Sequence, residues 1–231
     1  MAHSISIVVP TYQERENIAD FIHRIESTLN GLNFEIVVVD DNSPDGTADL
    51  AEELNEQYGN IKVIRRPAKL GLGSAITDGI KASSSDVMVV MDADLQHPPE
   101  LLPKMLEEIR RGNDLVIASR YVEGGGVEGW SFSRRIISKG AKLLAHIFLP
   151  KTRSVRDPVS GFFMFKRSVV ENLELRTSGY KILLEILVKG SYNSLAEIPY
   201  TFVQRKRGES KLTLKEILGY VNLLINLKVG R

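Results

Sequence analysis

Residues 86–100, DVMVVMDADLQHPPE, decide the fold of this chain because they join an apolar strand to a polar loop and to the start of a helix. The run 86–91 is apolar after its first residue and rich in valine, which predicts a strand buried on both faces. This strand stops at Asp92, and Pro98 and Pro99 then favour the first turn of a helix. A strand that leads directly into a helix is the repeating unit of α/β proteins.

The same alternation of strands and helices extends on both sides of this stretch. Strands are predicted at residues 4–10, 34–39, 61–64, 86–91, 115–118, 161–166 and 194–203, and helices at 17–30, 47–57, 74–82, 98–112, 133–148, 182–189 and 212–228. Glycines 124–126 predict a flexible loop between the two halves. The pattern predicts an α/β fold with a mostly parallel sheet flanked by helices.

Composition restricts the function classes. The 231 residues include 30 Lys and Arg against 29 Asp and Glu, so the net charge of +1 argues against a general attraction to nucleic acid. Cysteine is absent, which excludes disulfides, thiolate metal sites and cysteine nucleophiles. Residues 1–10 lack a signal-peptide pattern, and the uncharged stretch at 217–227 is shorter than the roughly 20 residues needed to span a bilayer. We therefore expect a peripheral protein at the cytoplasmic face of a membrane, without a membrane span of its own.

Carboxylates follow two of the predicted strands, at the sheet edge where α/β proteins bind ligands. Asp92 and Asp94 are separated by one small residue, a spacing that lets two carboxylates hold Mg²⁺ or Mn²⁺ while substrate phosphate oxygens complete the coordination. Gln96 and His97 are close enough in sequence to add a neutral ligand or to orient a water. The alternative is that these residues only cap the helix that follows.

The exits of the first two strands form a second candidate site. Asp41 can accept hydrogen bonds from a nucleobase or a ribose, and the residues around Tyr12 would form the opposite wall. Turn chemistry alone explains Asp41 equally well. Neither a Gly-x-Gly-x-x-Gly motif after the first strand nor a Gly-Lys-Ser/Thr phosphate loop occurs, which argues against dehydrogenases and ATPases.

Two basic segments are candidate anion sites. Arg134 and Ser138 lie on one side of the predicted helix 133–148, which suits an interfacial helix facing lipid phosphates, or simply a solvated surface. In the segment 204–211, Arg205 and Lys211 could lie over a diphosphate, although the same run also fits an ordinary soluble loop.

Six ordered stretches together resemble one family over nearly the whole chain: residues 8–17, 39–47, 91–98, 118–121, 157–162 and 207–211. They are similar to the polyprenyl (dolichyl) phosphate mannose synthases, inverting glycosyltransferases of family 2 with the Rossmann-like GT-A fold. The resemblance implies metal-dependent transfer of mannose from GDP-mannose to a polyprenyl (dolichyl) monophosphate at a membrane surface. It also implies a GT-A catalytic domain over residues 1–211 and an amphipathic, membrane-interfacial helix over 212–231.

The resemblance further implies a role for each matching residue. Nucleotide-sugar binding is implied for Pro10, Tyr12, Glu14, Asp41, Asp92, Ala93, Asp94, Arg205 and Lys211; Mg²⁺ or Mn²⁺ binding for Asp92, Asp94 and Gln96; acceptor-phosphate binding for Arg120, Arg134 and Ser138; and a catalytic role for Asp94, Arg120, Arg134 and Lys211.

This sequence departs from the family pattern in two ways. Gln13 stands where the family commonly has Asn. Many relatives also continue into transmembrane helices, so we expect a shorter member anchored by a separate subunit, or a shortened chain. Three alternatives stay open: a UDP-glucose-dependent polyprenyl-phosphate glucosyltransferase, a polysaccharide synthase, and a non-catalytic module recruited to membranes.

Overall fold

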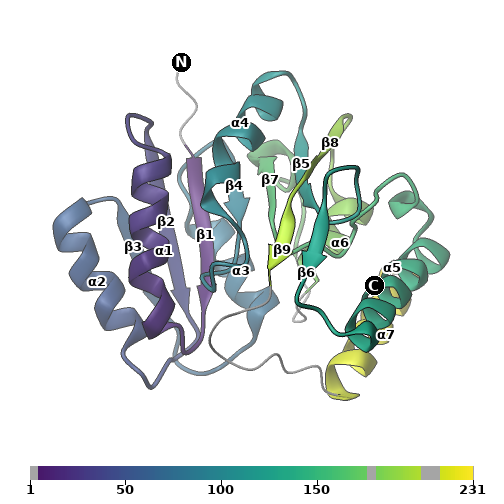
Figure 1. Ribbon diagram of the computed structural model, residues 1–231, viewed down its shortest axis with the longest axis horizontal. Helices are drawn as coiled ribbons and strands as arrows, with labels where there is room; N and C mark the ends of the chain where they lie inside the picture. Colours follow the sequence, from purple (N-terminus) through teal and green to yellow (C-terminus); the bar gives the residue numbers. More distant parts are fainter. Residues whose placement is uncertain (1–4, 176–180, 204–213, 231) are drawn as a thin grey trace.

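Strands and helices alternate along the computed structural model, which describes residues 5–175, 181–203 and 214–230 (Figure 1). The strands are β1 (Ile5–Thr11), β2 (Phe34–Asp40), β3 (Ile61–Arg65), β4 (Val87–Val90), β5 (Leu115–Ser119), β6 (Gly126–Glu128), β7 (Phe163–Lys166), β8 (Leu195–Pro199) and β9 (Thr201–Val203). The helices are α1 (Arg15–Thr28), α2 (Thr47–Tyr58), α3 (Leu72–Ala82), α4 (Leu102–Arg110), α5 (Phe132–Phe148), α6 (Ile182–Lys189) and α7 (Leu214–Val229), with short 3-10 turns at Pro99–Leu101, Pro150–Thr152 and Arg167–Val169.

The central sheet has the strand order β3-β2-β1-β4-β7-β5-β8. Strands β1 to β4 pair in parallel, β7 enters antiparallel between β4 and β5, and β8 pairs in parallel with β5. The prediction of a mostly parallel α/β sheet is therefore confirmed. Because β1, β2 and β4 run the same way, their carboxyl ends meet at one edge.

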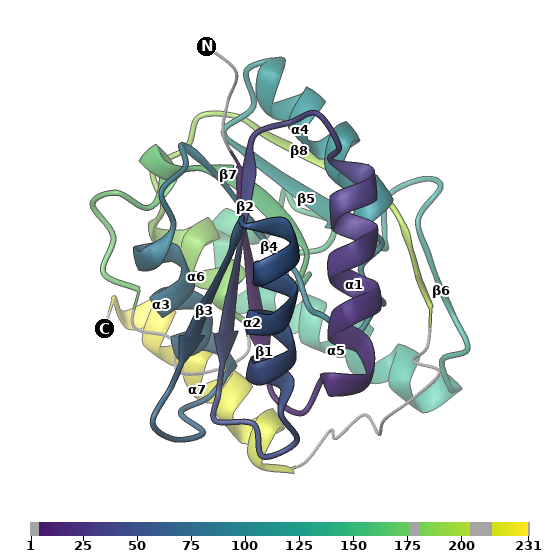
Figure 2. The same ribbon diagram turned by 90° about the vertical axis from the view of Figure 1, so that its left-hand side faces the viewer.

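Helices cover both faces of the sheet because side chains alternate along each strand. Ile5, Ile7 and Val9 pack in one core cluster with residues of α1, α2 and α4, whereas Val8 packs in another with residues of α3 and α6. The two helical layers lie on opposite sides of the strands in Figure 2. Close packing is enforced at Gly79 of α3, where a Cβ would lie 2.4 Å from Cγ1 of Val8.

Two predictions for the later strands are wrong. The stretch 194–203 is two strands that break at Tyr200, whose amide donates to Ser119 O at 3.1 Å and whose carbonyl accepts from Gly126 N at 3.1 Å. These bonds hold β8 in the main sheet and turn β9 toward β6. The predicted flexible loop at 124–126 therefore ends in a strand, β6, which pairs with β9.

Helices α5 and α7 lie side by side at one end of the molecule (Figure 1). Tyr220, Leu224 and Leu227 form the buried stripe of α7, and the Tyr220 hydroxyl donates to Ala141 O of α5 at 2.7 Å. On the remainder of α7, Leu218 and Ile225 are exposed. No helix within the described residues has the length and apolar character needed to cross a membrane.

Candidate active site

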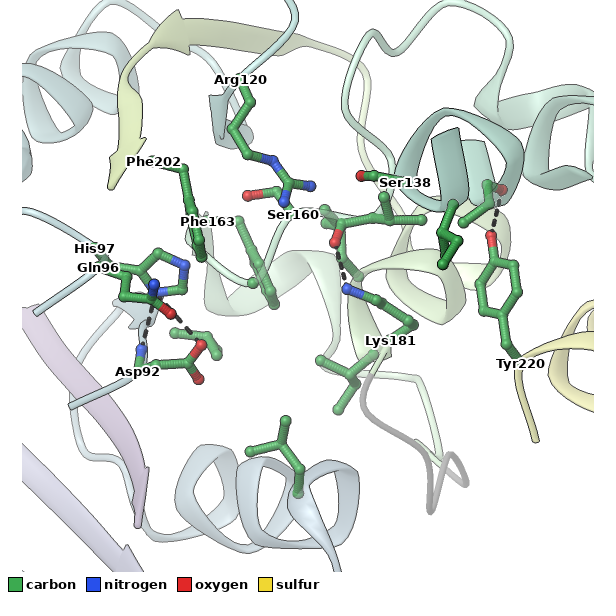
Figure 3. A pocket seen from close by; sticks show the side chains of 18 of the residues that line it. Asp92, Gln96, His97, Arg120, Ser138, Ser160, Phe163, Lys181, Phe202 and Tyr220 are labelled. Atoms are coloured by element: carbon green, nitrogen blue, oxygen red, sulfur yellow. Dashed lines mark hydrogen bonds and ion pairs between the residues drawn. The ribbon is translucent and has the colours of Figure 1, made fainter. Parts of the chain in front are cut away.

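A cavity of about 490 Å³ lies beyond the ends of β4 and β5, between the sheet, α5 and the start of α6 (Figure 3). Both polar and apolar side chains line it. The polar lining residues are Asp92, Asp94, Gln96, His97, Arg120, Arg134, Ser138, Ser160 and Lys181, and the apolar ones include Leu72, Ile76, Val90, Ile137, Leu144, Val159, Ile182, Leu183 and Val221. All six residues predicted to bind the metal or the acceptor phosphate therefore line one cavity.

The candidate metal ligands lie in the loop that follows β4. Asp92 has a side chain 36% exposed, and Asp94 accepts the amide of Gln96 at 3.0 Å. The amide nitrogen of Gln96 donates to Val203 O at 2.8 Å, so the amide oxygen is the atom with which Gln96 would coordinate. Two carboxylates and an amide oxygen suit a hard divalent cation whose remaining positions are completed by substrate oxygens and water. Across the described part of the chain, no three His, Cys, Asp or Glu side chains form a closed metal cage.

His97 holds this loop in place. Its Nδ1 accepts the Asp92 amide at 3.0 Å, and its ring stacks on Phe162 with centroids 5.3 Å apart. Gly161 leaves room for this packing, because a Cβ there would lie 3.2 Å from Cε1 of His97 and 3.5 Å from Oδ2 of Asp92. The position of the Asp92 backbone is thus fixed by the His97 ring and its packing on Phe162.

Backbone strain gathers in the loops after β1, β2 and β4. Among the described residues, the non-glycine positions with left-handed φ are Gln13 (59°), Asn42 (61°) and Leu95 (60°). Such conformations cost energy and occur most often at functional sites. All three lie at the sheet edge where the sequence predicts the ligands.

Arg120 is locked onto a carboxylate that the sequence reasoning had not assigned. Asp157 is fully buried, accepts Nε and Nη2 of Arg120 at 2.8 Å each, and also accepts the Arg120 amide at 3.0 Å. Burial alone would lower the pKa of Arg120, but these hydrogen bonds and the charge of Asp157 raise it above its usual value. The guanidinium is therefore a permanent cation with a fixed orientation.

Arg134 and Ser138 of α5 each contact an aromatic side chain. The guanidinium of Arg134 lies 4.5 Å from the ring centroid of Trp130, a cation–π distance. The Ser138 hydroxyl lies 2.7 Å from the hydroxyl of Tyr121. Both side chains reach the cavity from one face of the helix, as the sequence pattern predicts.

Lys181 is a lining residue that the sequence reasoning missed. It immediately precedes α6, and its ammonium donates to Val159 O at 2.8 Å (Figure 3). Burial lowers the pKa of Lys181 to about 8, and the nearby Arg120 adds to this effect. The signal in the sequence is weak: one lysine ahead of the apolar run Ile182–Leu184.

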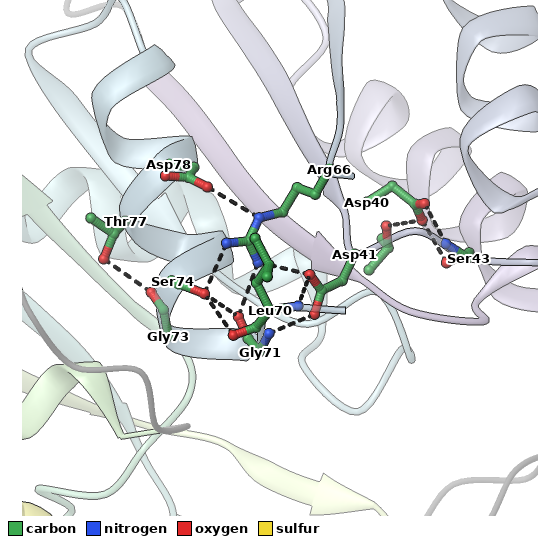
Figure 4. Close-up of polar contacts among 11 residues, drawn as sticks. Asp40, Asp41, Ser43, Arg66, Leu70, Gly71, Gly73, Ser74, Thr77 and Asp78 are labelled. Carbon is green, nitrogen blue, oxygen red and sulfur yellow. Dashed lines mark hydrogen bonds and ion pairs between the residues drawn. The ribbon is translucent and has the colours of Figure 1, made fainter. Parts of the chain in front are cut away.

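The predicted nucleoside residues lie at the ends of β1 and β2, outside this cavity lining. Asp41 is buried and accepts Nη1 of Arg66 at 2.7 Å and the amides of Leu70 and Gly71 at 2.8 Å each (Figure 4). The loop 66–71 is thus tied over the end of β2. Nucleobase recognition by Asp41 stays a prediction.

The other predicted nucleoside residues surround the same strand ends. Pro10 lies in β1 opposite Val39. The ammonium of Lys69 lies over the Tyr12 ring, 3.4 Å from the ring centroid. Glu14 directly precedes α1, where its carboxylate accepts Nδ2 of Asn17 at 2.7 Å.

Three further positions are predicted to bind the nucleotide sugar. Ala93 is buried in the core and does not line the cavity. Arg205 and Lys211 lie outside the described residues.

The glycosyl transferase family 2 model matches residues 6–174 of the chain. The sequence is 54% identical to a dolichol-phosphate mannosyltransferase of Pyrococcus furiosus, over 96% of this chain and 63% of the relative. Enzymes of the same name from Mycosarcoma maydis and Saccharomyces cerevisiae are 36% and 35% identical, over 97% and 99% of this chain and 79% and 88% of theirs. This chain thus spans less than two thirds of the Pyrococcus furiosus relative.

Solved structures share the fold. Glucosyl-3-phosphoglycerate synthase of Mycobacterium tuberculosis, in complex with Mn²⁺, UDP and glucosyl-3-phosphoglycerate, superposes with a TM-score of 0.72 at 21% identity. The match covers 99% of this chain and 79% of that one, and another crystal structure of the same synthase gives a TM-score of 0.71. At this identity the likeness establishes the architecture alone.

Proposed function

The chain belongs to glycosyl transferase family 2, and on that premise we propose that it transfers mannose from GDP-mannose to a polyprenyl (dolichyl) monophosphate with inversion at the anomeric carbon. Its relatives at 35 to 54% identity carry the name dolichol-phosphate mannosyltransferase. The observation that carries the proposal is the single cavity in which carboxylates, cations and an apolar wall meet. A sugar nucleotide needs carboxylates that can hold a metal ion at its diphosphate. A lipid phosphate needs cations for its phosphate and apolar side chains for its chain.

The chemistry brings two anions together. An oxygen of the acceptor phosphate attacks the anomeric carbon, a new C–O bond forms, and the bond to the diphosphate breaks as GDP leaves with the electron pair. A phosphate monoester has a second pKa of about 6, so its oxygen is already a nucleophile at neutral pH and needs no general base. Neutralising and aligning the charges is therefore the main task of the site.

The residues present fit this division of labour. Asp92, Asp94 and Gln96 would hold Mg²⁺ or Mn²⁺, which when bound neutralises the charge that develops on the leaving diphosphate. Arg120 and Arg134 bind the acceptor phosphate, and Ser138 donates its hydroxyl to it. Asp157 and Trp130 keep the two guanidinium groups oriented before the substrate arrives.

The nucleoside and the diphosphate have their own proposed contacts. Pro10, Tyr12, Glu14 and Asp41 would enclose the guanosine at the ends of β1 and β2. Arg205 and Lys211 would approach the diphosphate, and Ala93 would contribute its backbone between the two metal-binding carboxylates. For a base to stack on Tyr12, the ammonium of Lys69 has to leave that ring.

Transfer from labelled GDP-mannose to a polyprenyl phosphate in detergent is the direct test. We expect lipid-extractable product with Mg²⁺ or Mn²⁺, none with EDTA, and recovery when the metal is restored. Parallel reactions contain UDP-glucose. Product from UDP-glucose alone would mean that the donor is UDP-glucose and not GDP-mannose. No product from either donor, with normal binding of GDP, would favour a non-catalytic module.

We also propose that the protein works at the cytoplasmic face of a membrane, with residues 1–211 as the catalytic domain and 212–231 as an interfacial helix. The support comes from α5, whose exposed apolar side chains lie next to its basic ones. The exposed apolar residues of α5 are Phe132, Ile136, Ile137, Leu143, Leu144 and Ile147. An anchoring subunit would add to this contact.

Replacing Phe132, Ile136 and Leu143 together by serine is expected to weaken binding to anionic liposomes by about tenfold or more, because each side chain loses apolar burial. Flotation measures the bound fraction. The control is Leu70→Ser, which changes an exposed leucine on the loop over β2. Equal flotation of the triple variant and the unchanged protein would mean that α5 does not carry the membrane contact.

A further inference from the structure

Lys181 is a buried cation in the cavity wall that the proposed reaction has not yet used. The segment 157–161 fixes its place, because alternate residues of that segment meet three charged groups. Asp157 binds Arg120, the Val159 carbonyl accepts the Lys181 ammonium, and a Cβ at Gly161 would lie 3.5 Å from the Asp92 carboxylate. Lys181 is thus attached to the same short segment that also contacts the acceptor arginine and a candidate metal ligand.

The electrostatics of the fold disfavour a cation at this point. The side chain is buried, and burial favours the neutral amine. The positive charge of Arg120 lowers the pKa of Lys181 further, and the carboxylates of Asp157 and Asp92 offset these two effects only in part. Lys181 also stands at the amino-terminal end of α6, where the helix dipole is positive. A residue needed only to bond the Val159 carbonyl could do so as a neutral donor, without these costs.

The negative charge of the bound substrates would offset the cost of burying the Lys181 ammonium. Asp157 neutralises Arg120, so that pair adds little net charge near the reacting groups. During transfer the leaving diphosphate and the attacking phosphate lie together, and the position between them carries the highest negative charge. The Lys181 ammonium lines the same cavity as Asp92 and Arg120 and interacts with the charges of both, so it is placed to meet that negative charge.

We propose that the Lys181 ammonium binds a phosphate oxygen of the substrates at the junction between the nucleotide-sugar site and the acceptor site. The inference rests on the proposed function for the identity of the two phosphates. The chemistry is the same for either source, the donor diphosphate or the acceptor monoester, and separate measurements distinguish them.

The test compares Lys181→Met, which keeps the length and removes the charge, with Lys181→Arg, which keeps the charge. We expect Lys181→Met to have an unchanged or higher Tm and a kcat/KM about 30- to 100-fold lower, as for the loss of one charge-assisted hydrogen bond. Lys181→Arg should retain most of the activity. The matched control is Lys151→Met, since Lys151 also donates to a backbone carbonyl, Val188 O at 2.7 Å, but is exposed and outside the cavity.

Two binding measurements identify the phosphate. Calorimetry with GDP and Mg²⁺ reports on the diphosphate, and the KM for polyprenyl phosphate reports on the acceptor. Weaker GDP binding in Lys181→Met assigns the contact to the donor, and a raised acceptor KM with unchanged GDP binding assigns it to the acceptor. If both stay unchanged, or if activity falls only in proportion to a lower Tm, Lys181 is structural and the proposal is wrong.

A failure of the proposed function can be distinguished from a failure of the Lys181 proposal. If the unchanged protein transfers no sugar, the affinities of the unchanged protein and Lys181→Met for GDP and for inorganic pyrophosphate still report on the phosphate contact. Equal affinities for both anions would then overturn the Lys181 proposal independently of the reaction.

Discussion

Asp94→Ala is expected to lower the rate of sugar transfer by about 1,000-fold, the scale on which the loss of charge stabilisation in a transition state acts. Asp94 lines the cavity next to Asp92 and shares its loop with Gln96. Under the proposed function, Asp94 would help to hold the divalent ion that neutralises the leaving diphosphate, and its carboxylate is lost in this variant. The readout is the single-turnover rate with Mg²⁺ or Mn²⁺ at saturating concentration.

The matched control is Asp20→Asn, which removes an exposed carboxylate on α1, far from the cavity. It should keep full activity and an unchanged dependence on metal concentration. Asp94→Ala should also show a weakened Mn²⁺ affinity by calorimetry, independent of turnover. Normal metal-dependent transfer by Asp94→Ala would remove the metal assignment from this loop.

Local sequence signals predicted much of the fold because they act through neighbours in the chain. The apolar run before Asp92 forms β4, and the helix predicted at 182–189 has the bounds of α6. Asp92 and Arg120 line the same cavity because both follow strands whose ends lie at the same edge of the sheet.

Features that depend on topology could not be predicted in this way. The antiparallel entry of β7 between β4 and β5 brings the segment 157–161 between Asp92 and Arg120, and no local pattern encodes that placement. The partnership of Arg120 with Asp157 and the burial of Lys181 follow from it. Likewise, the stripe that α7 buries depends on where α5 lies.

One departure from the family pattern has a local physical meaning. Gln13 has a φ of 59°, in the left-handed region that asparagine tolerates better than glutamine. The commoner Asn would therefore reduce strain at this turn. The loop is nevertheless fixed by the segment after β2, since the backbone N–H of Gln13 donates to the Ser43 hydroxyl at 2.9 Å.

Removal of Asp157 should destabilise the protein more than any other single change considered above. In Asp157→Leu the Arg120 guanidinium stays buried without its bidentate partner, which costs about 3–5 kcal/mol. For a chain of this size we expect Tm to fall by about 6–20 °C. Thermal unfolding measures the shift, and transfer assays on the folded fraction measure the loss of acceptor use.

The double variant Arg120→Met/Asp157→Leu separates the two roles of the pair. Replacing both charges by apolar side chains of similar size removes the stranded cation, so most of the lost stability should return. A small deficit should remain, because the Arg120 backbone amide also donates to Asp157. Acceptor use should stay as low as in Asp157→Leu, since the guanidinium is gone. Restored transfer in the double variant would show that Arg120 supports the fold and does not bind the acceptor phosphate.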